Sequence, residues 1–189
     1  VDPVSHSAWA SENSPEYDVR ELGSPDERCD PFSLEFGRGI GGLLAHLSAG
    51  FLRWRSYENP YCPYRAFAAW AGDRIVGLSV FKFDDRSRTG YVSELAAVPA
   101  DSIAVEDLLY ALLQPGLDRF RLRGYRCAEA RFSGPHPFNQ TARSVLARCG
   151  FVEVKDDHAA EFLVRPMTPD GERFRDLGTW RIAELMREY

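Results

Sequence analysis

The chain has 189 residues, 44% of them hydrophobic, which suffices for one well-buried core. Its net charge is −5 and its pI is near 5.4, whereas binding along a nucleic-acid backbone needs a concentrated positive surface. No apolar run approaches the roughly 20 residues that span a membrane. We therefore expect a soluble protein whose function involves neither nucleic acid nor membrane.

The four cysteines are scattered, without the spacing of a disulfide scaffold or a zinc site, so we expect no metal and reduced thiols in a cytoplasmic protein. Residues 1–15 are rich in Ser, Pro and Asn and lack periodicity, which predicts a flexible N-terminal arm. Residues 16–189 are then expected to form a single domain.

The first half of this domain predicts a strand at 17–22 and a helix within 31–57. The helix is indicated by apolar residues at spacings of three and four, namely Leu43, Leu44, Leu47, Phe51 and Trp54. Two prolines then predict a loop at 58–63.

Aromatic and β-branched residues next predict strands at 65–71 and 74–83, joined by a tight turn at Gly72-Asp73. A polar turn at 84–88 leads into a third antiparallel strand at 90–98. Both faces of these strands are apolar, so we expect layers of helices on both sides of the sheet.

The second half predicts a helix that starts at Asp101 or Ser102 and is kinked or split at Pro115-Gly116 before ending near 123. A strand at 125–132, a loop at 133–138 and a helix from Asn139 follow. The remaining expected elements are strands at 152–154 and 161–164 and a C-terminal helix at 179–189.

The stretch from Asn139 to Phe151 carries the most specific pattern. Asn139, Ala142, Leu146 and Gly150 fall on one stripe of a helix, and Gly150 suits a helix C-terminus that requires positive φ. This pattern resembles the last core helix of the GCN5-related N-acetyltransferases, the GNAT superfamily, although Leu146 replaces the usual Tyr.

The element order over residues 16–165 also resembles that superfamily, as does the segment 52–65, which is similar to a sparsely characterised bacterial branch. The resemblance implies an α/β (α+β) fold with a mostly antiparallel, splayed central sheet flanked by helices. It further implies acetyl-CoA, or another acyl-CoA, as the cofactor.

By this resemblance, Glu94 is the general base, with solvent exposure or pairing with an Arg as the alternatives. The backbone of Leu95, Ala96 and Val98 would pair with the pantetheine arm like an added strand. Asn139 would hydrogen-bond the same arm, unless it only caps its helix.

The expected phosphate loop, at 99–107, departs from the family pattern because it is shorter, lacks glycine and contains three carboxylates. Ser102 is its candidate cofactor contact. The glycine-rich segment 37–44 resembles a phosphate loop, but no strand clearly precedes it, so we interpret it as a flexible loop leading into a helix.

The acceptor side of the cleft would be formed by Tyr57, Asn59, Tyr61 and His136, with Trp54 either beside them or in the core. With Leu146 in place of Tyr, the proton for the leaving thiolate would come from Tyr110, Ser144 or water.

The sequence therefore predicts an N-acetyltransferase that moves acetyl from acetyl-CoA directly to a small-molecule amine in a ternary complex. Two alternatives stay open: a non-catalytic binding domain of the same fold, and acyl transfer from the pantetheine arm of a carrier protein. A homodimer also stays open.

Overall fold

The computed structural model describes residues 17–40, 46–60, 63–100, 103–130, 132–133, 137–152 and 182–183. The arm predicted at 1–15 therefore lies outside the described residues. The elements follow in the order β1 (Asp18–Glu21), α1 (Cys29–Ile40), α2 (Ala49–Leu52), the π-helical turn η1 (Arg53–Tyr57), β2 (Tyr64–Ala71), β3 (Arg74–Asp84), β4 (Thr89–Ala97), α3 (Val105–Leu122), β5 (Cys127–Ala130), β6 (Phe132–Ser133), α4 (Pro137–Arg148) and β7 (Ile182–Ala183).

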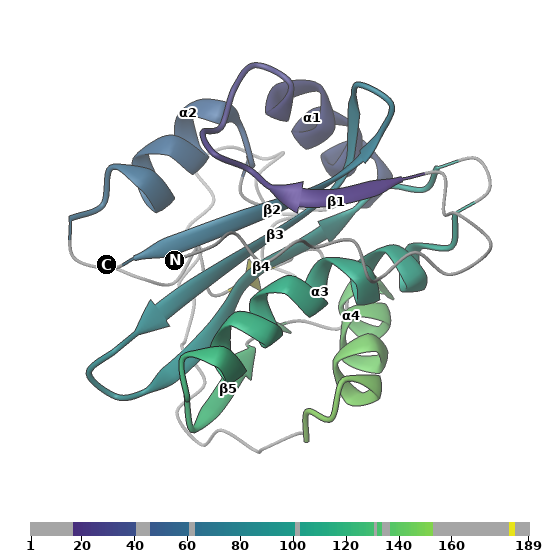
Figure 1. Ribbon diagram of the computed structural model, residues 1–189. Coiled ribbons are helices and arrows are strands. Elements are labelled where there is room, and N and C mark those ends of the chain that lie inside the picture. The colour runs from purple at the N-terminus through teal and green to yellow at the C-terminus, as the bar shows by residue number, and fades with distance from the viewer. Residues whose placement is uncertain are drawn as a thin grey trace, which may run out of the picture.

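The central sheet has the strand order β1-β2-β3-β4-β5 (Figure 1). Neighbouring strands from β1 to β4 are antiparallel, whereas β5 returns through α3 to lie parallel to β4. Gly72 turns the β2–β3 hairpin with φ of +60°, a conformation that costs glycine little. The strands predicted from residue 17 to residue 98 and the hairpin are thus confirmed.

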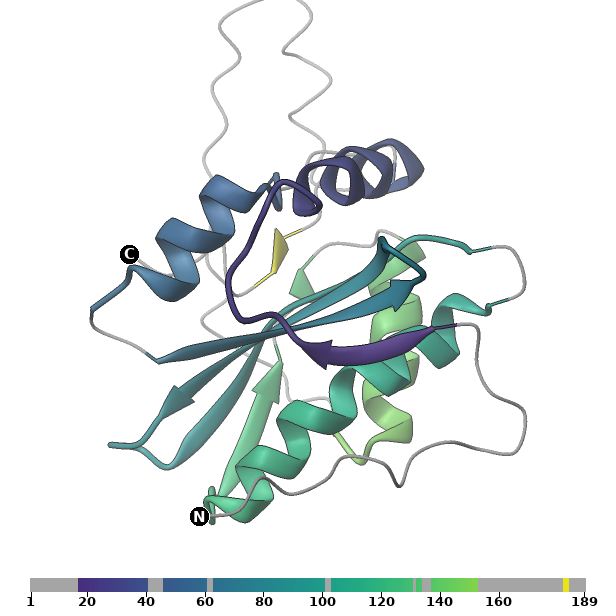
Figure 2. The ribbon, with the colours of Figure 1, turned by 45° about the horizontal axis from the view of Figure 1, so that its top comes forward.

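Helices cover both faces of this sheet, as the two apolar faces of the strands predict. Figure 2 shows α1 and α2 on one face and α3 and α4 on the other. Phe81 and Phe83 project from β3 toward α3, where both rings contact Phe120. These rings are almost completely buried and form the centre of the core between the sheet and α3.

The single helix predicted within 31–57 is wrong, because a second helix begins after Ser48. The Ser48 hydroxyl accepts a hydrogen bond from Phe51 N, and the Asp30 carboxylate of α1 accepts one from Ala49 N at 2.9 Å. Together they satisfy two of the free amides at the start of α2. Trp54 is 62% exposed, so its assignment to the buried stripe is also wrong.

The segment predicted as a loop at 37–44 is helical in its described part, since residues 37–40 form the last turn of α1. A phosphate loop joins a strand to the start of a helix, whereas Gly37 and Gly39 lie in the last turn of a helix. The interpretation as a loop is therefore wrong at 37–40, and residues 41–44 lie outside the described residues.

The split predicted at Pro115-Gly116 is also wrong, because α3 continues through both residues. A Cβ atom at Gly116 would lie only 2.2 Å from the ring of Phe81. The absence of a side chain here lets the helix lie directly on the sheet. Packing of this aromatic ring holds α3 in place although Pro115 cannot donate a backbone hydrogen bond.

The helix predicted from Asn139 is confirmed but starts earlier, at Pro137. Asn139, Ala142 and Leu146 are buried along one stripe, as their spacing predicts. Gly150 has φ of +90°, and Phe151 N donates to Leu146 O at 3.0 Å, which closes the helix C-terminus. Because Asn139 lies inside the first turn, it is not the N-cap residue.

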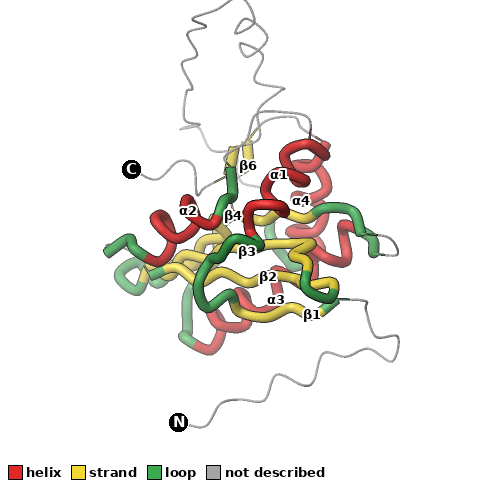
Figure 3. The backbone as a smooth tube through the Cα atoms, turned by 90° about the horizontal axis from the view of Figure 1, so that it is seen from above, coloured by secondary structure: helices red, strands yellow, loops and turns green. Residues whose placement is uncertain are grey.

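The C-terminal predictions fall mostly outside the described residues. Of the strand predicted at 152–154 only Val152 is described, and it lies in no strand; the strand at 161–164 lies entirely outside. The helix predicted at 179–189 is wrong at Ile182–Ala183, which form β7 by pairing with β6. This pairing and the contact of β7 with β4 override the local helical pattern (Figure 3). No described helix is both long and apolar enough to cross a membrane.

Candidate functional site

The edge of β4 that faces β5 is paired along only part of its length. The β4–β5 ladder runs from Thr89 opposite Cys127 to Val92 opposite Ala130. Beyond Val92, no described strand forms a ladder with this edge, because the chain after β5 turns to pair with β7. The two strands therefore part at the middle of β4, where the sequence predicts a splayed sheet.

The phase of the β3–β4 ladder determines which backbone groups face this open edge. Val98 N donates to Val76 O at 3.0 Å, and backbone groups in an antiparallel pair alternate in direction. The N–H and C=O groups of Ala96 therefore also point toward β3. Those of Leu95 and Ala97 point the other way, into the gap. An added strand would thus bond to Leu95 and Ala97, and not to Ala96 and Val98 as the sequence predicts.

The faces of β4 follow from its neighbours on α3. Ser79 Oγ donates to Leu112 O, so the side chain of Ser79 and that of its cross-strand partner Leu95 face α3. Phe81 contacts α3 as well, which places its partner Val92 on the same face. The side chains that flank residues 93 and 94 in β4, those of Val92 and Leu95, therefore both face α3.

A β-bulge lies between these two positions, since the register shifts where Glu94 pairs with Val80 and Val92 pairs with Phe81. Ser93 is the extra residue. With Val92 and Leu95 both facing α3, the side chains of Ser93 and Glu94 both turn to the opposite face, which α1 and α2 cover. The bulge thus places two consecutive polar side chains on the same face beside the gap.

Glu94 is buried within this site, with 1% of its surface exposed. Solvent exposure, one alternative to its role as a base, is excluded by this burial. Its Oε1 accepts a hydrogen bond from Leu95 N at 3.0 Å. The same amide faces the gap, so the carboxylate occupies a donor that an incoming carbonyl group would need.

Asn139 lies in the first turn of α4, the helix that follows β5 and β6 in the chain, and it is fully buried. Leu146, two turns further along the same helix, is buried and offers no proton. Of the substitutes considered for the thiolate donor, Ser144 is exposed, and the ring of Tyr110 lies under the Arg148 guanidinium at 4.2 Å.

The start of α3, where the sequence predicts the phosphate loop, has acidic residues. Ala104 is the N-cap residue of α3, and its side chain makes no hydrogen bond to the first turn. Glu106 and Asp107 occupy the first turn, and Arg148 approaches Asp107 at 3.4 Å. These carboxylates stabilise the helix through its dipole but oppose an anionic ligand. Ser102, the predicted phosphate contact, lies outside the described residues.

Of the four residues predicted on the acceptor side, Tyr61 and His136 lie outside the described part of the chain. Asn59 is half-buried. The Tyr57 hydroxyl donates a hydrogen bond to Leu22 O. Burial, together with the nearby negative charge of Glu21, raises the pKa of Tyr57 to about 12. This hydroxyl therefore connects η1 to the end of β1.

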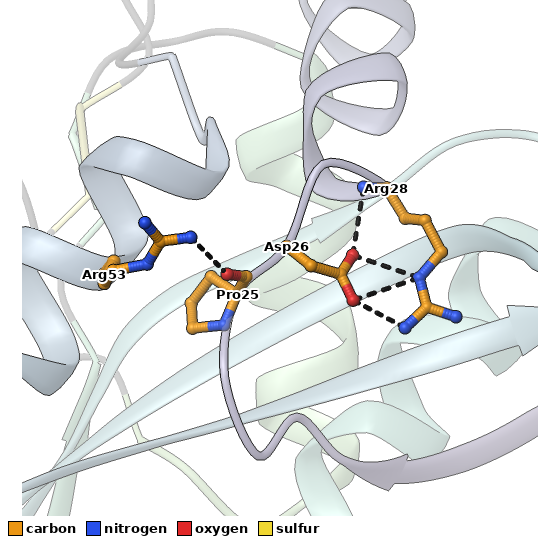
Figure 4. Close-up of polar contacts among 4 residues, drawn as sticks. All are labelled: Pro25, Asp26, Arg28 and Arg53. Atoms are coloured by element: carbon orange, nitrogen blue, oxygen red, sulfur yellow. Dashed lines mark hydrogen bonds and ion pairs between the residues drawn. The ribbon is translucent and has the colours of Figure 1, made fainter.

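A second hydrogen bond attaches η1 to the same part of the chain. Arg53 Nη2 donates to Pro25 O at 3.0 Å, next to the turn in which Arg28 pairs with Asp26 (Figure 4). Trp54 carries an exposed ring between these anchors. The π-helical turn is thus held over the sheet by contacts made through Arg53 and Tyr57.

Sequence reasoning missed Ser93 as a site residue. The signal was present, because Ser93-Glu94 interrupts an otherwise apolar strand with two polar residues in succession. Strict alternation would put one of them on each face, and only the bulge turns both to the same face.

Comparison with solved structures identifies the fold. A probable acetyltransferase superposes with a TM-score of 0.57 and 16% identity over 78% of this chain and 98% of its own. An aminoglycoside acetyltransferase from an uncultured soil metagenomic sample gives a TM-score of 0.55 and 19% identity, over 78% and 99% of the two chains.

A tandem GNAT protein from the clavulanic acid biosynthesis pathway gives a TM-score of 0.50 and 17% identity, over 68% of this chain and 43% of that protein. The chain has the GNAT fold. No family model and no curated protein matches the sequence. The GNAT fold confirms the α/β fold class that the order of elements predicted.

Proposed function

We propose that this protein is an acyl-CoA-dependent N-acyltransferase that moves an acetyl group directly to a small-molecule amine in a ternary complex. The observation that carries the proposal is the bulge in β4. It places the buried carboxylate of Glu94 beside Leu95, whose amide lies on the edge of β4 beyond Val92, the last residue paired with β5. A proton acceptor and a donor for a carbonyl oxygen thus lie next to each other at one gap.

The residues around the gap divide the chemistry between them. The Leu95 amide donates a hydrogen bond to the acyl carbonyl oxygen, on which negative charge develops during attack. Glu94 accepts the proton that the amine nitrogen loses. The bound acyl thioester supplies the activated acyl group. A C–N bond forms and the C–S bond breaks, and the thiolate keeps the electron pair and takes a proton from water.

The structure fits the pantetheine arm better than the nucleotide part of CoA. The backbone groups of Leu95 and Ala97 face the gap and can pair with an extended amide-containing chain. Asn139, buried in the first turn of α4, would hydrogen-bond the same arm through its side-chain amide. The first turn of α3, in contrast, presents Glu106 and Asp107 to the phosphates.

This contrast favours a second candidate, in which a carrier protein presents the acyl-pantetheine arm without the nucleotide of CoA. Calorimetric titration with acetyl-CoA and with acetyl-pantetheine separates the two. Micromolar binding of acetyl-CoA that weakens sharply in Asn139→Ala supports the CoA-dependent enzyme. Equal affinity for the two ligands supports the carrier protein as donor.

The absence of binding by either ligand to the folded protein would refute both candidates and would favour a non-catalytic domain. Transfer itself is tested by incubating the protein and acetyl-CoA with a panel of small primary amines. Chromatographic detection of the acetylated amine is the required result.

A further inference from the structure

The strand β7 lies at the level of the gap in the sheet. Ala130, the last residue of β5, is opposite Val92. Two residues further along the chain, Phe132 is level with Glu94, because both strands advance by about 3.3 Å per residue. Phe132 pairs in turn with Ala183 of β7, and β7 also contacts β4. A segment that is distant in the sequence therefore lies beside the edge of β4 beyond Val92.

The distance between β7 and β4 leaves no room for another chain between them. Cα atoms of the two strands lie within 8 Å of each other. Neighbouring strands in a sheet are about 4.8 Å apart, so a chain bound between β4 and β7 would separate them by about 9.6 Å. An extended pantetheine arm that pairs with Leu95 and Ala97 would therefore have to displace β7.

We propose that β7 is a strap that covers the edge of β4 beyond Val92 and moves away when the acyl-pantetheine arm binds. This inference rests on the proposed acyltransferase function, and it adds regulation of that site by a strand of the same chain. The hydrogen bond from Leu95 N to Glu94 Oε1, at 3.0 Å, fits a closed state, because it occupies a donor that the acyl group would need. Both interactions have to be released before the arm can pair with β4.

The attachment of β7 is weak enough to release. Within the described residues, its ladder with β6 consists of two residue pairs, whereas four pairs join β4 to β5. Among these residues β6 and β7 form a sheet of their own, separate from the five-stranded one. A sheet of two strands is only marginally stable by itself. β7 can therefore leave while the five-stranded sheet, and with it the gap, stays folded.

The first test follows hydrogen exchange of the wild-type protein by mass spectrometry, without and with saturating acetyl-pantetheine. We expect the ligand to speed exchange in the segment 182–183 by at least about tenfold, because its amides leave the ladder with β6. Exchange at Leu95 and Ala97 should slow, because their amides pair with the arm. Unchanged or slower exchange at 182–183 in the ligand-bound protein would overturn the strap.

The second test removes the attachment of β7. Ile182→Pro combined with Ala183→Pro deletes both backbone N–H groups of the strand, and we expect the Kd for acetyl-pantetheine, measured by calorimetric titration, to fall about tenfold. Ile182→Val combined with Ala183→Val keeps both N–H groups and favours a strand, so its Kd should match that of the wild type. Both variants should keep the wild-type circular dichroism, because β7 is not part of the five-stranded sheet.

The remaining outcomes separate the strap from the function of the site. Equal affinity of the wild type and the proline variant for acetyl-pantetheine would overturn the strap and leave the acyltransferase intact. Equal tightening in the valine variant would also overturn it, because that variant keeps the ladder. If the proline variant fails to fold, the exchange experiment on the wild type decides. A folded wild type and a folded proline variant that bind neither acetyl-CoA nor acetyl-pantetheine would refute the proposed function itself.

Discussion

Substitution of Glu94 separates binding of the acyl donor from catalysis. In the structure, Glu94 Oε1 accepts the Leu95 N–H at 3.0 Å, and this amide faces the gap. The carbonyl oxygen of a bound acyl group needs the same N–H, so the Glu94 carboxylate must first release it. This internal hydrogen bond therefore limits the fraction of protein molecules that can bind acetyl-CoA productively. Substitutions that weaken the bond should strengthen binding of acetyl-CoA.

The size of the effect follows from the kind of hydrogen bond that is lost. A bond to a charged acceptor contributes about 1.5–3 kcal/mol, and one between neutral groups about 0.5–1.5 kcal/mol. Glu94→Gln keeps a neutral acceptor, so its hydrogen bond to Leu95 N–H is weaker by about 1 kcal/mol. We therefore expect the Kd for acetyl-CoA to fall roughly fivefold. Glu94→Ala removes the competing group, and we expect about 10- to 100-fold tighter binding.

The assay is calorimetric titration of each variant with acetyl-CoA, which needs no knowledge of the acceptor. Turnover, measured as acetylated benzylamine, should fall at least tenfold in both variants because the base is missing. Glu27→Gln, an exposed change in the loop between β1 and α1, controls for the altered net charge. Unchanged or weaker acetyl-CoA binding in both Glu94 variants would refute the competition between the carboxylate and the acyl carbonyl.

Gly116→Ala should lower the free energy of unfolding by about 2 kcal/mol, because forcing a methyl group against the Phe81 ring outweighs the gain in helix propensity. Gly50→Ala, where an added Cβ meets nothing within 4 Å, should be neutral or stabilising; denaturant melts that rank the two alike would contradict this packing argument. Burial raises the pKa of Tyr57 from 10 to about 12, so the stability it contributes below pH 10 is lost as pH rises from 10 to 12. Tyr57→Phe should reduce this alkaline loss in pH-dependent melts, and an unchanged pH profile would show that Tyr57 does not cause it. Glu106→Gln should tighten CoA but not pantetheine, and calorimetry that finds equal changes would show that the nucleotide does not approach α3.

The sequence by itself determined those elements whose signals are local. Gly72 and Gly150 adopt positive φ, as a hairpin turn and a helix end require, and both were placed from residue type alone. Apolar runs between turn residues predicted β2, β3 and β4, and residues spaced three and four apart along one stripe predicted α4. The order of these elements, together with the pattern from Asn139 to Phe151, resembled that of the GNAT superfamily, and this resemblance predicted the fold.

Only the tertiary structure decided the arrangement of the candidate site. The bulge that turns Ser93 and Glu94 to one face depends on the register between β3 and β4, which no local pattern specifies. The direction of the Leu95 amide follows from the same register. The continuity of α3 through Gly116 depends on a ring from another strand.

These features share a physical cause. Propensity and periodicity describe what one segment favours, whereas a bulge, a buried carboxylate or a close helix contact depends on which neighbour fills the adjacent space. The sequence could therefore indicate that Glu94 lies at the centre of a splayed sheet. Packing of β4 against β3 and α3 determined which face Glu94 occupies, that Leu95 N–H is its partner, and that Ser93 lies beside it.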